Sequence, residues 1–308
     1  MIELRNVTKL YGKVIGVNDI TLTLADGAYG LLGPNGSGKS TLLNLITGQL
    51  RPTLGRVRVL GESPRNNARL FRRLGYCPSG EGLYANVSGY DWVKYLLRLQ
   101  GWNARDSESS AAENMELVGM ADAMHRPISS YSRGMRQRTK LAQALAHNPD
   151  FLILDEPFNG LDPVGRHELA VVLRGWLEPG KSLLFASHLL HEIEAITQSF
   201  LLICGGRLLA AGTAEDVHAM MEGLPNEIAL RCSDAHTLAA MLVRERAADS
   251  VSISGDTLTV ATKQPGRLYE KLPGWLADSK QEVFEMRSAD ESLQALFNSL
   301  MKMHRGEL

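Results

Sequence analysis

The most specific pattern in this 308-residue chain is Gly33-Pro34-Asn35-Gly36-Ser37-Gly38-Lys39-Ser40, followed by Thr41. It fits the pattern G-x-x-x-x-G-K-[ST], in which glycines let consecutive backbone N–H groups turn toward a phosphate. An apolar strand pattern, 30–32, leads into it and a helical pattern, 40–47, leads out. This order predicts a nucleoside triphosphate site at a helix N-terminus. Lys39 would reach the β- and γ-phosphates, and the Ser40 hydroxyl would hold Mg²⁺.

A second signal is a pair of adjacent carboxylates, Asp155 and Glu156, at the end of the buried strand pattern 151–154. The first carboxylate at a strand end can hold Mg²⁺ through water. The second projects to the opposite side and can polarise an attacking water as a general base. Alone, such a pair is a common solvated strand end. Together with the phosphate loop it predicts Asp155 as a metal ligand and Glu156 as the catalytic base.

The residues up to about 215 alternate short apolar runs with glycine turns and helical patterns, which is typical of an α/β sheet. Helices are expected at 106–126 and 135–147, where apolar residues recur at helical spacing. We therefore predict a nucleotide-binding domain over 1–215, with a helical subdomain at about 80–145, and an accessory domain over 216–308. The expected strands are 22–24, 28–32, 57–59, 151–154, 182–186 and 200–204.

The accessory domain is expected to be a small α+β domain of the ferredoxin-like kind, because its predicted elements follow the order β-α-β-β-α-β. It carries no cluster of metal ligands or nucleophiles, and plain stabilisation is one expected role. The predicted elements are a strand at 227–232, a helix capped by Ser233 or Asp234 and ending near 246, a hairpin of 251–254 with 257–260, a short helix before Pro273, a strand at 283–286 and a helix from Asp290.

Composition limits the possible ligands. Lys plus Arg number 33 and Asp plus Glu 34, so the net charge is -1. Such a balanced chain has no global field for nucleic acid, and none is expected as a partner. No apolar run approaches the roughly 18 residues of a membrane span, and the start shows no secretory signal pattern. The cysteines Cys77, Cys204 and Cys232 are far apart in sequence and are expected to be buried free thiols in a reducing compartment.

The segment Tyr131-Ser132-Arg133-Gly134-Met135 lies between the phosphate loop and the carboxylate pair, and Ser187-His188 follows them. This order of motifs, over about residues 1–220, resembles the ATP-binding cassette (ABC) ATPases. The family signature is L-S-G-G-Q, and this chain has Tyr131, Arg133 and Met135 at three of its positions. That variant resembles cassettes that serve exporters with a separate permease. The domain 216–308 resembles C-terminal extensions on related exporter cassettes, which implies dimerisation or regulation as its role. The resemblance implies a P-loop NTPase (RecA-like) core with antiparallel β and helical subdomains, and ATP and Mg²⁺ as cofactors.

The resemblance also implies roles for single residues. Tyr11 would stack on adenine, and Gly33 to Thr41 would bind the phosphates. Ser132 and Gly134 would contact the γ-phosphate held by a second cassette, and Asp162 lies in the loop that crosses the dimer interface. His188 would contact the γ-phosphate and keep the attacking water in line with the base, Glu156.

Ser79 departs from the family pattern. The lead-in 75–78 normally precedes a glutamine that touches Mg²⁺ and the attacking water and relays to the permease. Serine is too short to span to the metal, so a water must bridge or Glu81 must reach in. Slower or altered coupling is expected from this serine, without loss of hydrolysis.

The chain holds one phosphate loop and one signature, so the resemblance implies two cassettes, a homodimer being expected, beside a transmembrane permease at the cytoplasmic face of the inner membrane. Aromatic residues concentrated in 76–102 are expected either to receive a partner helix or to fill the helical subdomain. Arg65, Arg69, Arg72 and Arg73, at helical spacing, are expected to form a solvated face. Two alternatives stay open: a soluble cassette acting on ribosomes or nucleic acid, and a regulatory module that binds ATP without turnover.

Overall fold

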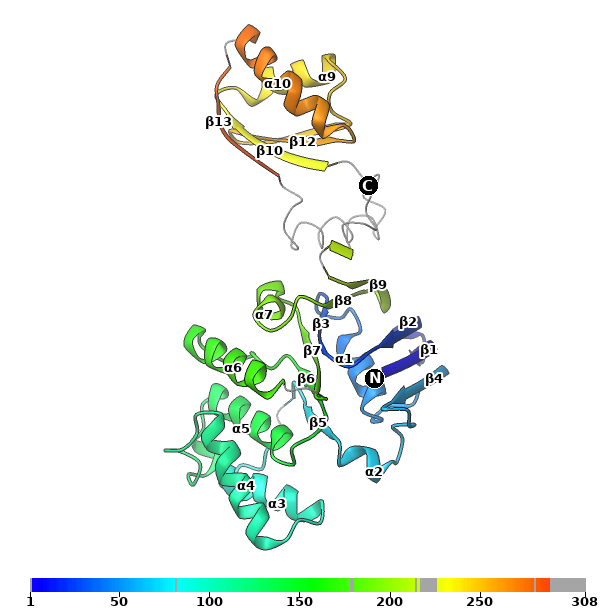
Figure 1. Cartoon of the computed structure of the whole chain (residues 1–308), viewed down its shortest axis with the longest axis vertical. Coiled ribbons are helices and arrows are strands. Elements are labelled where there is room, and N and C mark those ends of the chain that lie inside the picture. The colour runs from blue at the N-terminus through cyan, green and yellow to red at the C-terminus, as the bar shows by residue number, and fades with distance from the viewer. Residues whose placement is uncertain are drawn as a thin grey trace. The chain divides into compact units, whose positions relative to one another are not determined.

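The computed structural model describes residues 2–80, 82–177, 180–213, 215–216, 226–279 and 281–288. The chain divides into two compact units, Met1–Thr213 and Ala214–Leu308, and each has its own hydrophobic core (Figure 1). The expected helix from Asp290 and the side chain of Glu81 lie outside the described residues. Within those residues, no helix is both long enough and apolar enough to cross a membrane.

A six-stranded sheet with the order β5-β6-β7-β3-β8-β9 forms the centre of the N-terminal unit. Five of its strands are parallel, and β9 runs antiparallel to β8. Every residue of β6 and β7 is buried, as the continuous apolar runs predict for strands covered on both faces. Because parallel strands end at one edge, the segments after β3, β5, β6 and β7 converge there. The strands are β3 (Ala28–Leu32), β5 (Leu74–Cys77), β6 (Phe151–Asp155), β7 (Ser182–Ser187), β8 (Phe200–Cys204) and β9 (Arg207–Gly212).

A second, antiparallel sheet of three strands has the order β2-β1-β4, with β1 at Ile2–Tyr11, β2 at Val14–Leu24 and β4 at Leu54–Val59. Strands β2 and β4 are longer than the predicted 22–24 and 57–59, and β1 was not among the expected strands. Exposed polar positions interrupt the apolar pattern of all three. Helix α1 (Lys39–Ile46) joins the two sheets in one core: Leu42 and Leu43 belong to the same buried cluster as Val57 of β4 and Ile153 of β6.

The helices of the N-terminal unit begin at side-chain caps in most cases. Ser88, Asn103 and Ser132 accept a backbone N–H at the start of α3, α4 and α5. The single helix expected at 106–126 is wrong: α4 ends at Leu117, and Gly119 with a φ of +73° turns the chain there. The bounds are α2 (Ala68–Phe71), α3 (Gly89–Leu99), α4 (Ala104–Leu117), the 3₁₀ turn Ile128–Ser130, α5 (Arg133–Leu145), α6 (Pro163–Trp176) and α7 (Leu190–Glu194).

The C-terminal unit is a four-stranded antiparallel sheet with the order β11-β12-β10-β13. The described elements follow one another as β-α-β-β-α-β, the predicted succession. The short helix expected before Pro273 is wrong, because α10 continues through this proline. Leu268 and Leu272 of α10 are buried in the core of this unit, and their packing offsets the hydrogen bond that proline cannot donate. The elements are β10 (Asn226–Cys232), α9 (Ala235–Arg244), β11 (Ser250–Ser254), β12 (Thr257–Thr262), α10 (Pro265–Ser279) and β13 (Val283–Ser288).

Two smaller expectations are settled by burial. Cys77, Cys204 and Cys232 are buried free thiols, as predicted. The four arginines Arg65, Arg69, Arg72 and Arg73 are all exposed, but they do not share one helix, since α2 includes only Arg69. Asn67 caps α2, which ends four residues later.

Candidate nucleotide site

The phosphate loop joins β3 to α1, and close contacts require its glycines. A Cβ atom at Gly33 would lie 2.4 Å from the carbonyl oxygen of Ile203, and one at Gly38 would lie 2.5 Å from that of Gly16. Gly38 also has a φ of +107°, in a region that residues with side chains rarely adopt. The loop therefore stays narrow and backbone-lined, as phosphate binding through N–H groups requires.

Lys39, the first residue of α1, is buried, with 6% of its surface exposed. Its ammonium donates to the carbonyl of Gly33 at 2.7 Å and to that of Pro34 at 3.4 Å. The ammonium also lies 3.3 Å from Oε1 of Glu156. A phosphate is a stronger acceptor than a carbonyl, because its bonds with lysine are charge-assisted. Lys39 is thus held at the loop, where a bound triphosphate would exchange these contacts for better ones.

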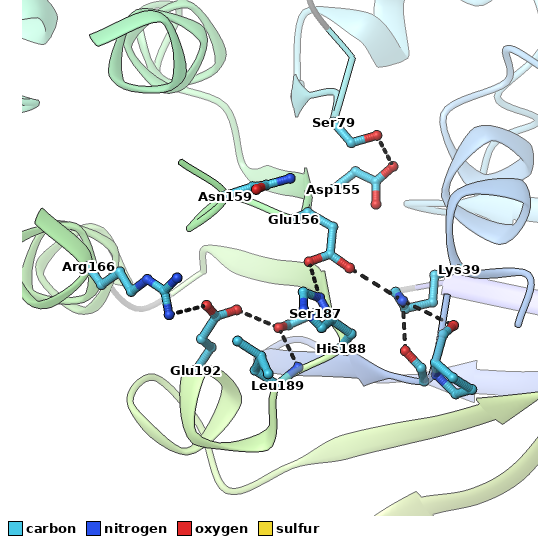
Figure 2. Close-up of polar contacts among 12 residues, drawn as sticks. Lys39, Ser79, Asp155, Glu156, Asn159, Arg166, Ser187, His188, Leu189 and Glu192 are labelled. Carbon is cyan, nitrogen blue, oxygen red and sulfur yellow. Dashed lines mark hydrogen bonds and ion pairs between the residues drawn. The ribbon is translucent and has the colours of Figure 1, made fainter. Parts of the chain in front are cut away.

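Glu156 directly follows β6 and has a φ of +51°, which is rare for a residue other than glycine. Its carboxylate lies between two partners in Figure 2: Oε1 faces Lys39, and Oε2 lies 2.9 Å from Nδ1 of His188. His188 follows the neighbouring strand β7. A strained backbone of this kind, which costs about 1–3 kcal/mol, marks a side chain that is held in one direction by its surroundings.

The Asp155 carboxylate is directed toward Ser79, which lies two residues after β5 (Figure 2). It is 1% exposed, and its Oδ2 accepts a hydrogen bond from Ser79 Oγ at 2.9 Å. Its Oδ1 is buried and has no hydrogen-bond partner among the described residues. Burial, with the charge of Asp155 adding to it, raises the pKa of Tyr76 to about 12. A buried carboxylate with one oxygen unpaired fits a divalent cation such as Mg²⁺, which prefers oxygen ligands.

Lys39, Ser79 and Glu156 line one hollow of about 420 Å³. Tyr11 lies at its edge, half exposed, with its hydroxyl 3.4 Å from that of Thr41. The hollow thus brings together the aromatic, phosphate-loop, base and Ser79 positions that the sequence singled out. Its lining consists of Tyr11, Val14, Ile15, Gly16, Pro34, Asn35, Gly36, Gly38, Lys39, Ser40, Thr41, Ser79 and Glu156.

Comparison with known proteins places the chain. A sequence model of the ABC transporter family matches residues 17–159. The chain is 35% identical over 219 residues to an uncharacterized ABC transporter ATP-binding protein, YxlF, of Bacillus subtilis, which covers 70% of this chain and 72% of the relative. The chain belongs to the ABC transporter family. This ABC protein is an ATP-binding ATPase subunit of the kind found in transporters.

A second relative of the ABC protein extends into its C-terminal unit. The Nod factor export ATP-binding protein I of Rhizobium johnstonii is 34% identical over 276 residues, which are 88% of this chain and 87% of the relative. Among solved structures, a dimeric post-hydrolysis state of the ATP-binding cassette MJ0796, bound to ADP and Pi, has a TM-score of 0.64 at 22% identity and covers 69% of this chain and 98% of that one. The N-terminal unit therefore has the α/β P-loop NTPase fold of ABC cassettes.

The hollow is not lined by Ser132, Gly134 or Asp162, nor by three other residues assigned by resemblance: Gly33, Ser37 and His188. His188 contacts Glu156, which does line the hollow. Ser132 accepts from the backbone of Met135 at 3.2 Å and caps α5, and Asp162 accepts from Gly165 at 2.9 Å and caps α6. Each therefore has a local structural role.

The remaining signature positions of the ABC protein have partners of their own. Tyr131 is buried, donates to Ala123 O at 2.8 Å and accepts from the backbone of Gly89 at 3.2 Å, which ties the signature to α3. Arg133 donates to the side chain of Asn159 at 2.8 Å. The hydroxyl of Tyr131 thus makes two hydrogen bonds that a leucine side chain could not make.

The sequence interpretation missed two groups that support the site of this ABC protein. Lys140 of α5 is 4% exposed, and its ammonium donates to the carbonyls of Pro78 at 2.8 Å, Gly80 at 3.1 Å and Ser79 at 3.4 Å. The sequence signal for this group was the position of Lys140 on the apolar face of a helix-period pattern. A lysine buried there requires hydrogen-bond partners for its charge.

The second group holds the turn at His188. The Ser187 hydroxyl donates to Glu192 and accepts from the backbone of Leu189 at 3.0 Å, while Arg166 lies 3.4 Å from the same glutamate (Figure 2). Glu192 is buried, with 5% exposed. No sequence motif reveals this group, because Arg166 comes from a different helix.

Proposed function

We propose that this chain is the ATP-hydrolysing subunit of an ABC exporter, which dimerises around two ATP molecules and drives a separate transmembrane permease at the cytoplasmic face of the membrane. The placement of the Glu156 carboxylate between Lys39 and His188 is the observation that carries the proposal. The exporter assignment is supported by the Y-S-R-G-M signature and by the similarity to the Nod factor export protein.

In the proposed reaction Glu156 is the general base, which accepts a proton from the water that attacks the γ-phosphate. Its Oε2 is held by His188, so only one oxygen is directed toward the phosphate loop. His188 orients the base and, exposed at 43% of its side chain, is accessible to the phosphate. Lys39 neutralises phosphate charge, and Tyr11 supplies the face on which adenine stacks. These roles follow general acid–base and phosphoryl-transfer chemistry.

Mg²⁺ would be held by the Ser40 hydroxyl and by Asp155 through water. The unpaired, buried Oδ1 of Asp155 supports this assignment. When bound, the ion would neutralise charge on the β- and γ-phosphates. The Ser79 hydroxyl, which donates to Asp155 Oδ2, would orient that carboxylate and would not replace a glutamine that reaches the metal itself.

Dimerisation is proposed because the signature faces no phosphate of its own chain. Ser132 and Gly134 stand at the N-terminus of the 13-residue helix α5, which favours an anion, and they do not line the hollow with Lys39. The loop with Asp162 would cross the interface. The C-terminal unit, whose strand order fits a ferredoxin-like domain, would contribute to dimerisation or regulation.

The permease would dock in a groove of about 430 Å³, called the docking groove below, which is lined by residues of α2, β5, α3 and α5 and of the loop after α1. Phe71 and Leu99 line it and are 39% and 66% exposed, while Tyr76 and Gln143 add polar tips. An apolar groove with a few polar groups fits an amphipathic helix. The aromatic residues of 76–102 have two different roles. Trp92 is 8% exposed and donates to Gln143, so it fills the helical subdomain, whereas Tyr95 is 54% exposed and could contact a partner.

Glu156→Gln tests hydrolysis and dimerisation together. The variant should bind ATP, lose turnover and form a dimer in size-exclusion chromatography with ATP, whereas the variant Lys39→Ala should stay monomeric. A Glu156→Gln chain that remains monomeric with ATP would contradict the dimer. Co-purification from membranes, with Leu99→Glu as the groove variant, tests the permease. Recovery with ribosomes and no multi-helix membrane protein would support a soluble cassette instead.

A further inference from the structure

Positive charge is concentrated in one short part of a chain whose net charge is -1. Residues 51–73 contain a single acidic residue, Glu62, and arginine is the only basic residue type among them. The arginines are Arg51, Arg56, Arg58, Arg65, Arg69, Arg72 and Arg73, and all are exposed. Such a local field attracts anions even though the whole molecule is balanced.

Three of these arginines line one cleft of about 500 Å³, called the basic cleft: Arg51, Arg56 and Arg65. They come from the loop after α1, from β4 and from the loop before α2. Across the part of the chain that the structure describes, none of the three side chains forms an ion pair, whereas Arg69 pairs with Glu62 and Arg73 with Asp150. The cleft therefore presents guanidinium groups that are available to an external anion.

The arrangement of the neighbouring strands adds to the positive field. Arg56 of β4 stands directly opposite Arg5 of β1, and Arg58 stands opposite Glu3. Like charges opposite each other destabilise a strand pair. Glu3 is the only acidic side chain of these two strands, and it already pairs with Arg5. An anion bound at the basic cleft would relieve this repulsion.

The basic cleft adjoins the docking groove. Gly48 lines the cleft, and the next residue, Gln49, lines the groove. Helix α2 separates the two on the other side, since Arg65 precedes it and Phe71 ends it. Leu54, which is 63% exposed, adds an apolar side chain to the cleft. A surface beside the permease groove would face the membrane, and an arginine-rich cleft with an exposed leucine suits the phosphate and upper acyl region of a lipid.

We propose that the basic cleft binds the headgroups of anionic phospholipids, so that the cassette contacts the bilayer itself beside the permease. The proposal rests on the proposed docking of a permease in the adjacent groove. Arginine is suited to this ligand, because its planar guanidinium binds phosphate oxygens in pairs. Each basic residue near an anionic leaflet contributes roughly a fivefold gain in binding.

Vesicle flotation tests the proposal with the purified full chain and no permease or nucleotide. The chain should float with phosphatidylcholine vesicles that contain about one third phosphatidylglycerol, and not with phosphatidylcholine alone. Arg51→Gln/Arg56→Gln/Arg65→Gln should weaken binding to the anionic vesicles about 100-fold at low salt. The matched control is Arg105→Gln/Arg244→Gln/Arg267→Gln, which makes the same change in net charge at exposed positions elsewhere and should keep binding.

The outcomes separate the possible sources of the anion. Equal loss in the two triple variants would show that only net charge matters and would overturn the proposal. Binding of inorganic phosphate at the cleft without vesicle binding would assign it to a soluble anion and would also overturn it. Both variants should keep the ATPase rate of the unmodified chain, since none of these arginines lines the nucleotide hollow. Because flotation needs neither dimer nor permease, its failure is distinguishable from failure of the Glu156→Gln test.

Discussion

Replacing Lys140 by methionine removes the buried ammonium that binds the loop 78–80 while keeping most of the side-chain volume. The ammonium donates to the carbonyls of Pro78, Gly80 and Ser79 at 2.8, 3.1 and 3.4 Å. Hydrogen bonds from charged groups contribute about 1.5–3 kcal/mol each, but the cost of burying the cation offsets part of this sum. We therefore expect Lys140→Met to lower the free energy of unfolding by about 2–4 kcal/mol.

The expected effect on catalysis follows from what the loop carries. With its carbonyls unbound, the loop no longer holds the Ser79 hydroxyl 2.9 Å from Asp155 Oδ2. The concentration of Mg²⁺ that half-saturates the ATPase should rise severalfold, while kcat at saturating Mg²⁺ should change less. Lys140→Arg, which keeps the charge and several donors, should restore most of the Mg²⁺ response. Ser79→Ala is the matched control, because it removes the contact with Asp155 and leaves the lysine in place.

The two measurements are urea denaturation and an Mg²⁺ titration of ATP hydrolysis. A merely structural lysine would lower stability without moving the Mg²⁺ response. If Lys140→Met unfolds at the same urea concentration as the unmodified chain and hydrolyses ATP with the same Mg²⁺ dependence, the assignment of Lys140 as a positioning residue is wrong.

Ser79→Gln should change the ATPase and transport rates without abolishing hydrolysis; unchanged rates would show that the serine has no effect on coupling. Burial lowers the pKa of His147, whose Nε2 contacts Leu74 O at 2.9 Å, so the folded state binds less proton than the unfolded state. Stability is therefore complete above the ordinary pKa of about 6.5 and falls as the pH drops below it, and His147→Gln should flatten this loss in denaturation curves at several pH values. The Cys77 thiol, whose pKa burial raises to about 12, should resist maleimide at pH 8 until the chain is unfolded, as mass spectrometry would show. Ser132→Asp keeps a good helix cap but adds a negative charge beside the γ-phosphate of a second cassette, so stability should hold while ATPase activity falls; full activity would argue against contact in trans.

Local patterns predicted the phosphate loop and the buried strands well. The loop is a contiguous glycine motif between a strand and a helix, so its residues are adjacent in the sequence. Strands such as β6 are buried on both faces and therefore appear as uninterrupted apolar runs. Where the structure differs, a packing or backbone effect intervenes. Gly119 ends α4 inside a helix-period pattern, and Leu272 keeps α10 intact through the next residue, Pro273.

The support of the site could not be predicted, because it depends on contacts between distant segments. Lys140 and the carbonyls it binds are separated by some 60 residues in sequence. Because every residue has a backbone carbonyl, the sequence does not show which carbonyls a lysine will bind. The direction of Glu156 is likewise set by a left-handed backbone that glutamate seldom adopts. What the sequence specifies is the chemistry available at each strand end, while the packed helices decide which groups meet.

The positions of Ser132 and Asp162 bear on why one chain does not make a complete site. Each side chain accepts a backbone N–H at the start of a helix, which leaves that helix end ordered before any nucleotide binds. An ordered helix N-terminus directs unpaired N–H groups outward and is already prepared for an anion. At α5, where the cap Ser132 is uncharged, such a helix end would suit a phosphate, and Ser132 lies outside the lining of the hollow of the same chain. At α6 the carboxylate of Asp162 already occupies the corresponding position. The proposed contact in trans follows from this placement: a phosphate bound at the N-terminus of α5 would come from another cassette, and Ser132 would serve first as helix cap and then as phosphate ligand.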